Sequence, residues 1–493
     1  MSAGADMTLA QAVYLSGKFE TRALCSGLSR CGRCRMRFIS EAPAPTDVEL
    51  AVLGPADLDS GWRLGCRRPA ESGMVVELPG RPADRESPKS RVLEDTDSIL
   101  AVDLGTTGID WSLVDGQRRL MSGGMLNPQL GAGSEVMSRL AFAAKGQNAE
   151  LLQNLVIDAL EDIIKETGMP GGMVISANQA MTCLLTGAPV QSISAAPYRL
   201  CHAGGLWVNL DRGLPEAYIL PQISPFVGGD AVAGIVAMRY SPDPPEPPYM
   251  LIDMGTNGEF VMALPGGRFL AASVPLGPAL EGVALSCGSV FWEGAVTGFD
   301  FGPNGLVARD GGLRPEGITG TGYVSLLARL ASAGVLDENG RFSAGETPLA
   351  RRAAFSEDFS GKRMDLPGGL YLTARDVEEV LKLKAAFNVA FSELISGAGL
   401  GPKDLKAILL SGALGHHAGP RDLETLGFLP EGSARAVHAA GNTSLRGAEI
   451  CAVRAEARAY AEEIPKSTEV VNLTESKNFA EKYVHAMKFK FVS

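Results

Sequence analysis

The chain has 493 residues, of which 45% are hydrophobic and 20% are charged, so it is globular and long enough for about three domains. The formal net charge of −11 and the aromatic content of 6% argue against a nucleic-acid binder, which needs an excess of Lys and Arg. No apolar run reaches the length of a membrane span, and the first residues lack a basic and apolar leader. We therefore expect a cytoplasmic protein with neither a nucleic-acid nor a membrane partner.

Half of the cysteines lie close to the start of the chain, at positions 25, 31, 34 and 66. The other half are scattered singly through the rest of the sequence: Cys183, Cys201, Cys287 and Cys451. We expect each of the scattered thiols to be a small buried apolar side chain, because each lies alone in apolar or Gly-rich surroundings. For the first four cysteines, disulfides are not expected in a reducing cytoplasm.

The spacing of the early cysteines is typical of a metal site. One loop that gives three thiolates, with a distant fourth, is the arrangement of ferredoxin-type 2Fe–2S sites. Gly27 and Gly32 would let backbone N–H groups of this loop turn toward the sulfurs. Zinc is the alternative, since Cys-x2-Cys is a zinc half-site, but a zinc ribbon would need a second close pair. The pattern therefore favours a 2Fe–2S cluster held by four residues: Cys25, Cys31, Cys34 and Cys66.

Arginines crowd the same region, at positions 30, 33, 35, 37, 63, 67 and 68. They are either solvated charges on a small domain or a positive field that favours the reduced cluster and attracts an acidic electron donor. The sequence supports both interpretations about equally.

The first domain is expected to end at Pro82, after a short apolar strand at 74–78. Residues 83–98 are polar and charged with few large apolar side chains, so they are predicted to form a linker.

A β-hairpin with a glycine-rich tip is then predicted twice. Residues 99–108 read ILAVDLGTTG and residues 249–258 read YMLIDMGTNG, and a second apolar strand follows each tip. Glycines let backbone N–H groups approach phosphate oxygens, and an Asp at a strand end can hold Mg²⁺ through water. Asp103 and Asp253 are therefore the predicted catalytic residues, which would organise Mg²⁺ and the attacking water. The predicted phosphate contacts are Gly105, Thr106, Thr107, Gly255, Thr256 and Asn257.

A third nucleotide motif is expected near residue 410. Residues 407–415 read AILLSGALG, a strand followed by Gly-x-x-Gly. In third place after the two hairpins, this segment resembles the adenosine motif of the actin, sugar kinase and Hsp70-like ATPases, which implies that Gly412 and Gly415 face the nucleoside of ATP. Two helices with small residues at helical spacing, at 231–239 and from Thr443 onward, are expected to cross closely between two lobes. The second helix would carry Ala448, Ala452 and Ala455 on one face.

Together these motifs resemble the reductive activators of corrinoid proteins over nearly the whole chain. Family-like segments include RLGCR at 63–67, GPALEG at 277–282 and LTARD at 372–376. The paired hairpins also resemble the two phosphate motifs of the actin, sugar kinase and Hsp70-like ATPases.

The resemblance implies a fold of mixed α/β and α+β class. Residues 1–82 would form a β-grasp ferredoxin-like domain, followed by the linker at 83–98. The remainder would be a two-lobed, ribonuclease H-like ATPase domain, with lobe I at 99–248 and lobe II at 249–493 including a C-terminal return to lobe I.

The resemblance also implies the function. The protein would use ATP, Mg²⁺ and its cluster to pass one electron to the inactive Co(II) corrinoid of a partner in a methyltransferase system, restoring Co(I). The electron donor is not identified, and the resemblance allows a homodimer. The alternatives are an actin-fold small-molecule kinase, an activator of another low-potential enzyme, and a redox chaperone or sensor that binds nucleotide without turnover.

Overall fold

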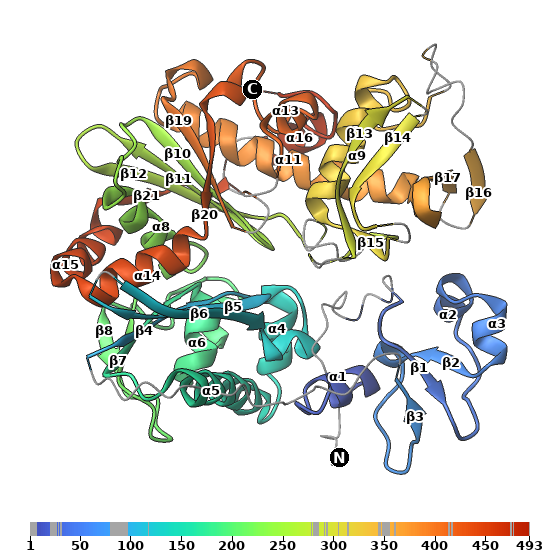
Figure 1. Cartoon of the computed structure of the whole chain (residues 1–493), viewed down its shortest axis with the longest axis horizontal. Coiled ribbons are helices and arrows are strands. Elements are labelled where there is room, and N and C mark those ends of the chain that lie inside the picture. Colours follow the sequence, from blue (N-terminus) through green and yellow to red (C-terminus); the bar gives the residue numbers. More distant parts are fainter. Residues whose placement is uncertain are drawn as a thin grey trace. The chain divides into compact units, whose positions relative to one another are not determined.

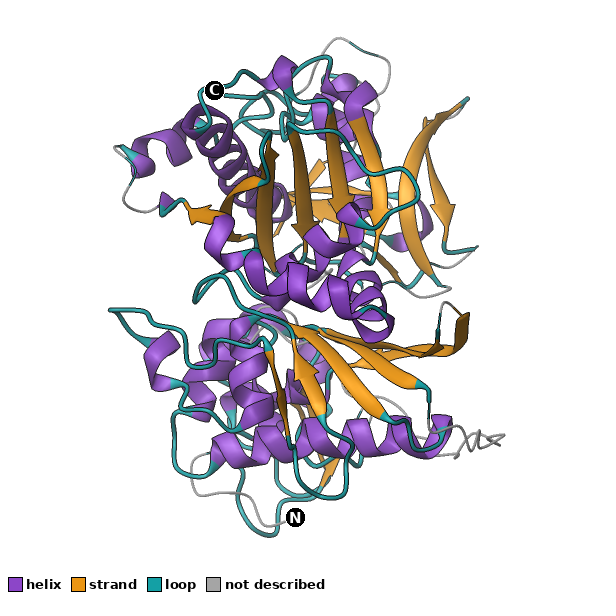
Figure 2. Ribbon diagram, turned by 90° about the vertical axis from the view of Figure 1, so that its left-hand side faces the viewer, coloured by secondary structure: helices purple, strands orange, loops and turns teal. Residues whose placement is uncertain are grey.

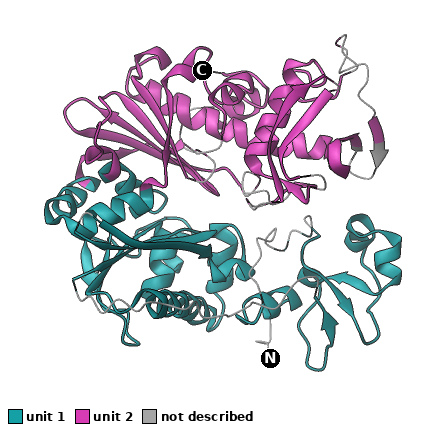
Figure 3. Cartoon of the chain, viewed as in Figure 1, with its two compact units in different colours: residues 1–236, 444–465 teal, residues 237–443, 466–493 magenta. Residues whose placement is uncertain are grey.

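The computed structural model describes most of the chain: residues 7–19, 27, 29, 32–78, 97–116, 118–277, 279, 285–289, 291, 294–303, 305–312, 315–343, 347, 355–358, 361–412, 415, 418–473, 476 and 478–492. The chain divides into two compact units (Figure 3). Unit 1 comprises residues 1–236 and 444–465, and unit 2 comprises residues 237–443 and 466–493. Most of the predicted linker lies outside the described residues. Among the described residues, no helix is both long and apolar enough to cross a membrane.

The N-terminal part of unit 1 is a small sheet with short helices. Its three antiparallel strands lie in the order β2-β1-β3, with β1 in the centre. Thr8 and Thr46 each close a capping box, which fixes the starts of the first two helices. The elements are α1 (Leu9–Tyr14), β1 (Arg35–Phe38), α2 (Asp47–Val52), α3 (Pro55–Asp59), β2 (Trp62–Leu64), η1 (Gly65–Arg67) and β3 (Val76–Glu77).

The rest of unit 1 is built on a six-stranded sheet in the order β6-β5-β4-β7-β9-β8. The long helix α5 runs along this sheet (Figure 1) and packs on it through an apolar stripe that includes Leu152, Val156 and Leu160. The elements are β4 (Ile99–Leu104), β5 (Gly108–Asp115), β6 (Arg118–Leu126), η2 (Pro128–Ala132), α4 (Val136–Ala143), α5 (Asn148–Thr167), β7 (Gly172–Ala177), α6 (Gln179–Thr186), α7 (Gln191–Ser194), β8 (Leu206–Val208), β9 (Ala217–Ile219), α14 (Thr443–Val453) and α15 (Ala455–Glu463).

Helix α8 (Gly229–Arg239) crosses α14 as closely as the small residues predict. A Cβ atom added to Gly447 would overlap the carbonyl oxygen of Ala233, so this glycine is required by the crossing. The prediction that Ala455 continues the face of Ala448 is wrong. Arg454 has extended backbone angles that end α14, and Ala455 is exposed at the start of α15.

Unit 2 also contains a six-stranded sheet, in the order β20-β19-β10-β11-β12-β21, whose strands lie side by side in Figure 2. Helix α11 packs on β11 and β12 through Phe387, Phe391 and Leu394. The elements of this layer are β10 (Tyr249–Met254), β11 (Asn257–Leu264), β12 (Arg268–Pro275), α11 (Ala374–Gly397), η4 (Pro402–Asp404), β19 (Ala407–Ser411), η5 (Ser433–Ala436), β20 (Val437–Gly441), η6 (Pro465–Ser467), β21 (Thr468–Val470) and α16 (Phe479–His485).

Two three-stranded sheets complete unit 2, in the orders β14-β13-β15 and β16-β17-β18. Helix α9 packs on β13 and against α13. These elements are β13 (Ala295–Gly302), β14 (Gly305–Asp310), β15 (Gly317–Ile318), α9 (Gly320–Ser332), β16 (Phe355–Asp358), β17 (Gly361–Asp365), η3 (Pro367–Gly369), β18 (Tyr371–Thr373) and α13 (Pro420–Thr425).

The two six-stranded sheets repeat one pattern of strand pairing. Strand β4 pairs antiparallel with β5 and parallel with β7, and β10 pairs antiparallel with β11 and parallel with β19. Both predicted hairpins are therefore confirmed, and each occupies the corresponding position in its own unit.

Candidate functional site

In unit 1, the sheet presents Asp103 at the end of β4, level with Ser176 on the neighbouring parallel strand β7. Ser444, at the start of α14, donates a hydrogen bond of 2.6 Å from its Oγ to Oδ1 of Asp103. The Ser444 and Ser176 hydroxyl oxygens lie 2.8 Å apart. These contacts orient the half-buried carboxylate at the hairpin's tip end.

Unit 2 repeats this arrangement around Asp253, which lies level with Ser411 on β19. The Ser411 hydroxyl donates to Oδ2 of Asp253 at 3.3 Å, and the Thr443 hydroxyl lies 2.6 Å from Ser411. A half-buried carboxylate oriented in this way is suited to ordering water around Mg²⁺, which keeps most of its hydration shell.

Within each hairpin tip, the central threonine is buried and its two neighbours are half-buried. Thr106 and Thr256 are buried, and the Thr106 hydroxyl accepts a hydrogen bond of 3.0 Å from Nδ2 of Asn178. The Gly255 N–H donates to the carbonyl of Asn257 at 3.1 Å. The half-buried tip residues are Gly105, Thr107, Gly255 and Asn257.

Gly412 approaches the second hairpin closely. Its φ of +81° lies in the left-handed region, and an added Cβ would stand 2.6 Å from Oδ1 of Asp253. An added Cβ on Gly415 would stand 2.7 Å from the backbone of Leu410. Both glycines therefore lie where a side chain would meet the strand ends. The residues between them lie outside the described part of the chain.

The sequence motifs did not reveal every residue that supports these tips. Arg139 donates to the tip residue Thr106, and Ser444 donates to Asp103. Ser176 and Thr443 each contact a hydroxyl that donates to one Asp. Ser176 and Ser411 could have been found by aligning the two repeats, because each lies beside an Asp in the same register. No motif marks Arg139, whose contacts depend on the fold.

At the predicted cluster site, the structure describes two of the four cysteines. Cys34 is buried and Cys66 is half-buried, and the hydroxyl of Ser29 lies 3.5 Å from the Cys66 sulfur. Gly27, Ser29 and Gly32 have φ values of 81°, 59° and 65°, so each of these three residues lies in the left-handed region. This geometry fits a loop wrapped around a cluster.

Cys25 and Cys31 lie outside the described residues. Among the residues that are described, no group of three or more His, Cys, Asp or Glu side chains is placed to hold a metal ion. The four-cysteine ligand set therefore stays a prediction.

Several of the arginines near the cysteines have structural partners. Arg68 pairs with the fully buried Glu49, and the buried Arg63 donates to three carbonyl oxygens. Burial raises the pKa of Glu49, but hydrogen bonds from Thr46, Arg68 and Leu64 outweigh burial and leave that pKa below its usual value. The structure thus assigns Arg63 and Arg68 to the fold of the domain, whereas Arg67 is exposed.

One prediction about the scattered cysteines is wrong. Cys183, on α6, and Cys201 form a disulfide, with their Cα atoms 6.2 Å apart. Their sequence separation is 18, so the chain returns to α6 within this short segment. Cys451 is buried as expected, and Cys287 is half-buried.

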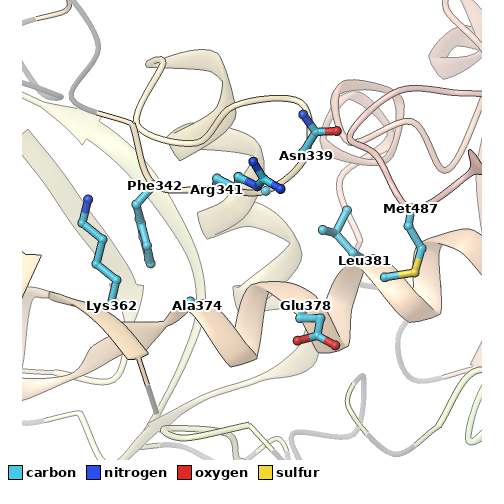
Figure 4. A pocket seen from close by; sticks show the side chains of 9 residues that line it. Asn339, Arg341, Phe342, Lys362, Ala374, Glu378, Leu381 and Met487 are labelled. Carbon is cyan, nitrogen blue, oxygen red and sulfur yellow. The ribbon is translucent and has the colours of Figure 1, made fainter. Parts of the chain in front are cut away.

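A separate pocket of about 380 Å³ lies in unit 2 beside α11 (Figure 4). Leu381 and Glu378 project from α11 there, and Met487 lies beside Leu381. Arg341 and Lys362 supply positive charge at the same pocket. It contains none of the predicted nucleotide contacts, so we assign it no part in nucleotide binding.

Comparisons with known proteins agree with this architecture. Residues 248–492 match a family model described as the C-terminal domain of RACo, the ASKHA domain, and residues 99–241 match one described as the RACo middle region. A solved structure of a reductive activator for corrinoid, iron-sulfur protein superposes with a TM-score of 0.69 and 20% identity, covering 99% of this chain and 96% of the other. That likeness supports the fold.

Two curated relatives extend the comparison. The corrinoid activation enzyme RamQ of Eubacterium limosum is 26% identical over 421 residues, which cover 78% of this chain and 69% of RamQ. A reductase of Methanosarcina barkeri, named for the Co(II) methylated amine-specific corrinoid protein, is 28% identical over 255 residues. That match covers 47% of this chain and 43% of the reductase.

Proposed function

Because this chain belongs to the RACo family, we propose that it is an ATP-dependent reductive activator of a corrinoid protein. The observation that carries the proposal is the repeated Asp-bearing hairpin, in a chain where the Ser29 hydroxyl also lies 3.5 Å from the sulfur of Cys66. The names of RamQ and of the Methanosarcina reductase support a corrinoid protein as the partner.

In this proposal, the hairpin tips bind the phosphates of ATP. Backbone N–H groups near Gly105 and Gly255 would contact phosphate oxygens, and Gly412 and Gly415 would lie against the nucleoside. Asp103 and Asp253, each held by a hydroxyl donor, would order the water around Mg²⁺ and the water that attacks the γ-phosphate.

The N-terminal part of the chain would serve electron transfer. Cys25, Cys31, Cys34 and Cys66 would hold a 2Fe–2S cluster, which when bound supplies one electron at a time. The fold around β1 would be β-grasp, with the domain limits expected from the sequence. An external low-potential reductant would supply each electron, and the Co(II) of the partner would accept it to become Co(I).

ATP can favour this unfavourable electron transfer only if nucleotide binding is thermodynamically linked to binding of the partner. The nucleotide must bind better to the form of the protein that binds the Co(II) partner, and the shift cannot exceed that difference in affinity. Hydrolysis of ATP, with Asp103 and Asp253 ordering the water, would then give ADP and phosphate, end the preference for the bound form and release the partner. The alternatives, a small-molecule kinase and an activator of a different low-potential enzyme, lack support from the named relatives.

The test adds the anaerobically reconstituted protein, Mg-ATP and a chemical reductant to candidate Co(II) corrinoid proteins, and follows the Co(I) absorption band. We expect Co(I) to form with the native chain and not with Asp253→Ala. Asp115→Ala, at the opposite end of β5 from its hairpin tip, is the matched control and should remain active. Co(I) formation that is equal without ATP would contradict the proposal.

A further inference from the structure

Asn127 and Arg139, which follow β6 in sequence, donate hydrogen bonds to the tip of the first hairpin. Nδ2 of Asn127 donates to the carbonyl of Gly105 at 2.8 Å, and the Asn127 N–H donates to the carbonyl of Thr107 at 2.8 Å. Arg139 donates to the carbonyl of Thr106 at 2.7 Å. Two side chains and one backbone group thus engage three successive carbonyls of the tip.

These hydrogen bonds fix the direction of the tip's N–H groups. In a planar trans peptide the N–H points away from the carbonyl of the same peptide unit. With the carbonyls of Gly105 and Thr106 turned toward Asn127 and Arg139, the N–H groups of Thr106 and Thr107 point to the opposite side. Consecutive N–H groups aligned in this way suit the binding of an anion such as phosphate.

Both gripping side chains are completely buried, with no exposed surface on either Asn127 or Arg139. A buried guanidinium is tolerated only where acceptors satisfy it, and Arg139 also donates to the carbonyl of Gly133 at 2.9 Å. Asn127 is the N-cap of η2, and its Oδ1 accepts from the Gln129 N–H at 2.9 Å. The tip and η2 are therefore parts of one hydrogen-bonded structure.

Helix η2 also packs against α1, through Gly131. An added Cβ on Gly131 would stand 2.9 Å from Cβ of Tyr14 and 3.1 Å from Cδ2 of Leu15. Leu15 belongs to the same apolar core as Ala132, whereas Tyr14 belongs to the core that contains Cys34. Helix α1 thus packs on two cores. One belongs to the small N-terminal sheet around Cys34, here called the cysteine domain, and the other to the six-stranded sheet of unit 1, here called lobe I.

We propose that Asn127 and Arg139 are positioning residues for the phosphate-binding tip, and that residues 127–139 couple nucleotide binding at this tip to the docking of α1 on η2. Nucleotide binding orders the tip, the order passes through Asn127 to η2, and the cysteine domain is held more firmly on lobe I. The inference rests on the proposed nucleotide site. Linkage requires the reverse effect as well, so docked α1 strengthens nucleotide binding by the same factor.

Gly131→Ala separates this coupling from the tip itself. The backbone of Gly131 is not left-handed, so alanine introduces no backbone strain, but its methyl group would crowd Tyr14 and Leu15. Gly54→Ala, where an added Cβ meets nothing within 4 Å, is the matched control. Leu15→Ala removes apolar contact from the side of α1 and should act in the same direction as Gly131→Ala.

The experiment measures hydrogen exchange of the α1 amides in the full chain, with and without Mg-ADP, alongside the affinity for Mg-ADP by calorimetry. We expect nucleotide to slow exchange in α1 by about fivefold or more, the lower end of ordinary coupling. Gly131→Ala should abolish this protection and weaken Mg-ADP binding by the same factor, while Gly54→Ala preserves both.

Three results would overturn the inference. If Mg-ADP binds but α1 exchange does not change, the coupling is absent while the proposed function survives. If Gly131→Ala and Leu15→Ala keep full protection, α1 docking is not the route. If the native chain binds no nucleotide at all, the inference fails together with the proposed nucleotide site.

Discussion

The hydroxyl oxygens of Ser411 and Thr443 lie 2.6 Å apart, and the next residue in the chain, Ser444, makes a similar contact with Ser176. Ser411 in turn donates to Asp253, and Ser444 donates to Asp103. The start of α14 thus carries consecutive hydroxyls, one for each predicted catalytic carboxylate. Each carboxylate therefore accepts from one hydroxyl, which α14 supplies to Asp103 and β19 supplies to Asp253.

Ser411→Ala and Thr443→Val should each lower the free energy of unfolding by about 1–2 kcal/mol, because each leaves the buried partner hydroxyl with one hydrogen bond fewer. Their effects should not add in the double variant, since both remove one shared contact. Urea unfolding of the two single variants and the double variant provides the measurement. Additive losses would show that the two hydroxyls act independently.

Asp253→Asn should lower the turnover number for ATP hydrolysis by about 10²-fold or more, because the amide cannot order the attacking water as the carboxylate does. Phosphate release under saturating Mg-ATP measures the change. Asp115→Asn, at the end of β5 that lies away from its hairpin tip, should leave the hydrolysis rate within about twofold of the native rate. Substitutions of surface residues usually have effects no larger than this. Equal losses of hydrolysis in both variants would contradict the catalytic role of Asp253.

Cys34→Ser and Cys66→Ser should each prevent assembly of a native 2Fe–2S cluster, because each removes one thiolate ligand. Iron analysis and the EPR spectrum of the reduced protein after anaerobic reconstitution measure the outcome. Cys451→Ser, at a buried thiol outside the predicted ligand set, is the control and should retain both iron and signal. An unchanged spectrum in Cys34→Ser would refute the ligand assignment.

Lys384 is completely buried on α11, and its Nζ donates to the carbonyls of Ala486, at 3.0 Å, and Lys490. Burial lowers the pKa of Lys384 to about 7 from 10.5. Between these two pH values the unfolded chain binds the proton and the folded chain does not, so this residue makes the protein more stable as the pH rises. The gain is on the order of a few kcal/mol, at about 1.4 kcal/mol for each unit of pKa shift.

Lys384→Met should therefore flatten the rise in the free energy of unfolding between pH 7 and pH 10. Lys382→Met is the matched control, because Lys382 lies on the same helix in a more exposed ion pair with Glu378. Urea unfolding across this pH range measures the slopes. A native slope retained in Lys384→Met would show that Lys384 stays charged in the folded protein.

The hairpins were predictable because their chemistry is local. Asp103 and Asp253 each sit in a strand–turn–strand pattern that repeats in the sequence, and Gly412 follows a strand that pairs with the second hairpin. The small residues at Ala233 and Ala448 also indicated the close helix crossing correctly. The break at Arg454 was missed because alanine-rich sequence on both sides favours a helix throughout.

Contacts between distant segments could not be predicted in the same way. Arg139 reaches the tip only because α4 packs beside it, and no spacing rule connects it to Thr106. Cys183 and Cys201 lie in unremarkable apolar surroundings, and only the returning chain brings them together. Side chains that support a site come from segments that are distant in sequence, so only the fold shows them. The residues of a motif are neighbours in sequence and can be found there.

The most direct test of the account is a single turnover from the reduced protein, with the cluster's EPR signal and the partner's Co(I) absorption followed in the same sample. With Mg-ATP and a Co(II) corrinoid protein, we predict that the cluster signal disappears as Co(I) forms, in equal amounts, and that neither change occurs without nucleotide. Co(I) that forms while the cluster stays reduced, or at the same rate without ATP, would contradict the account.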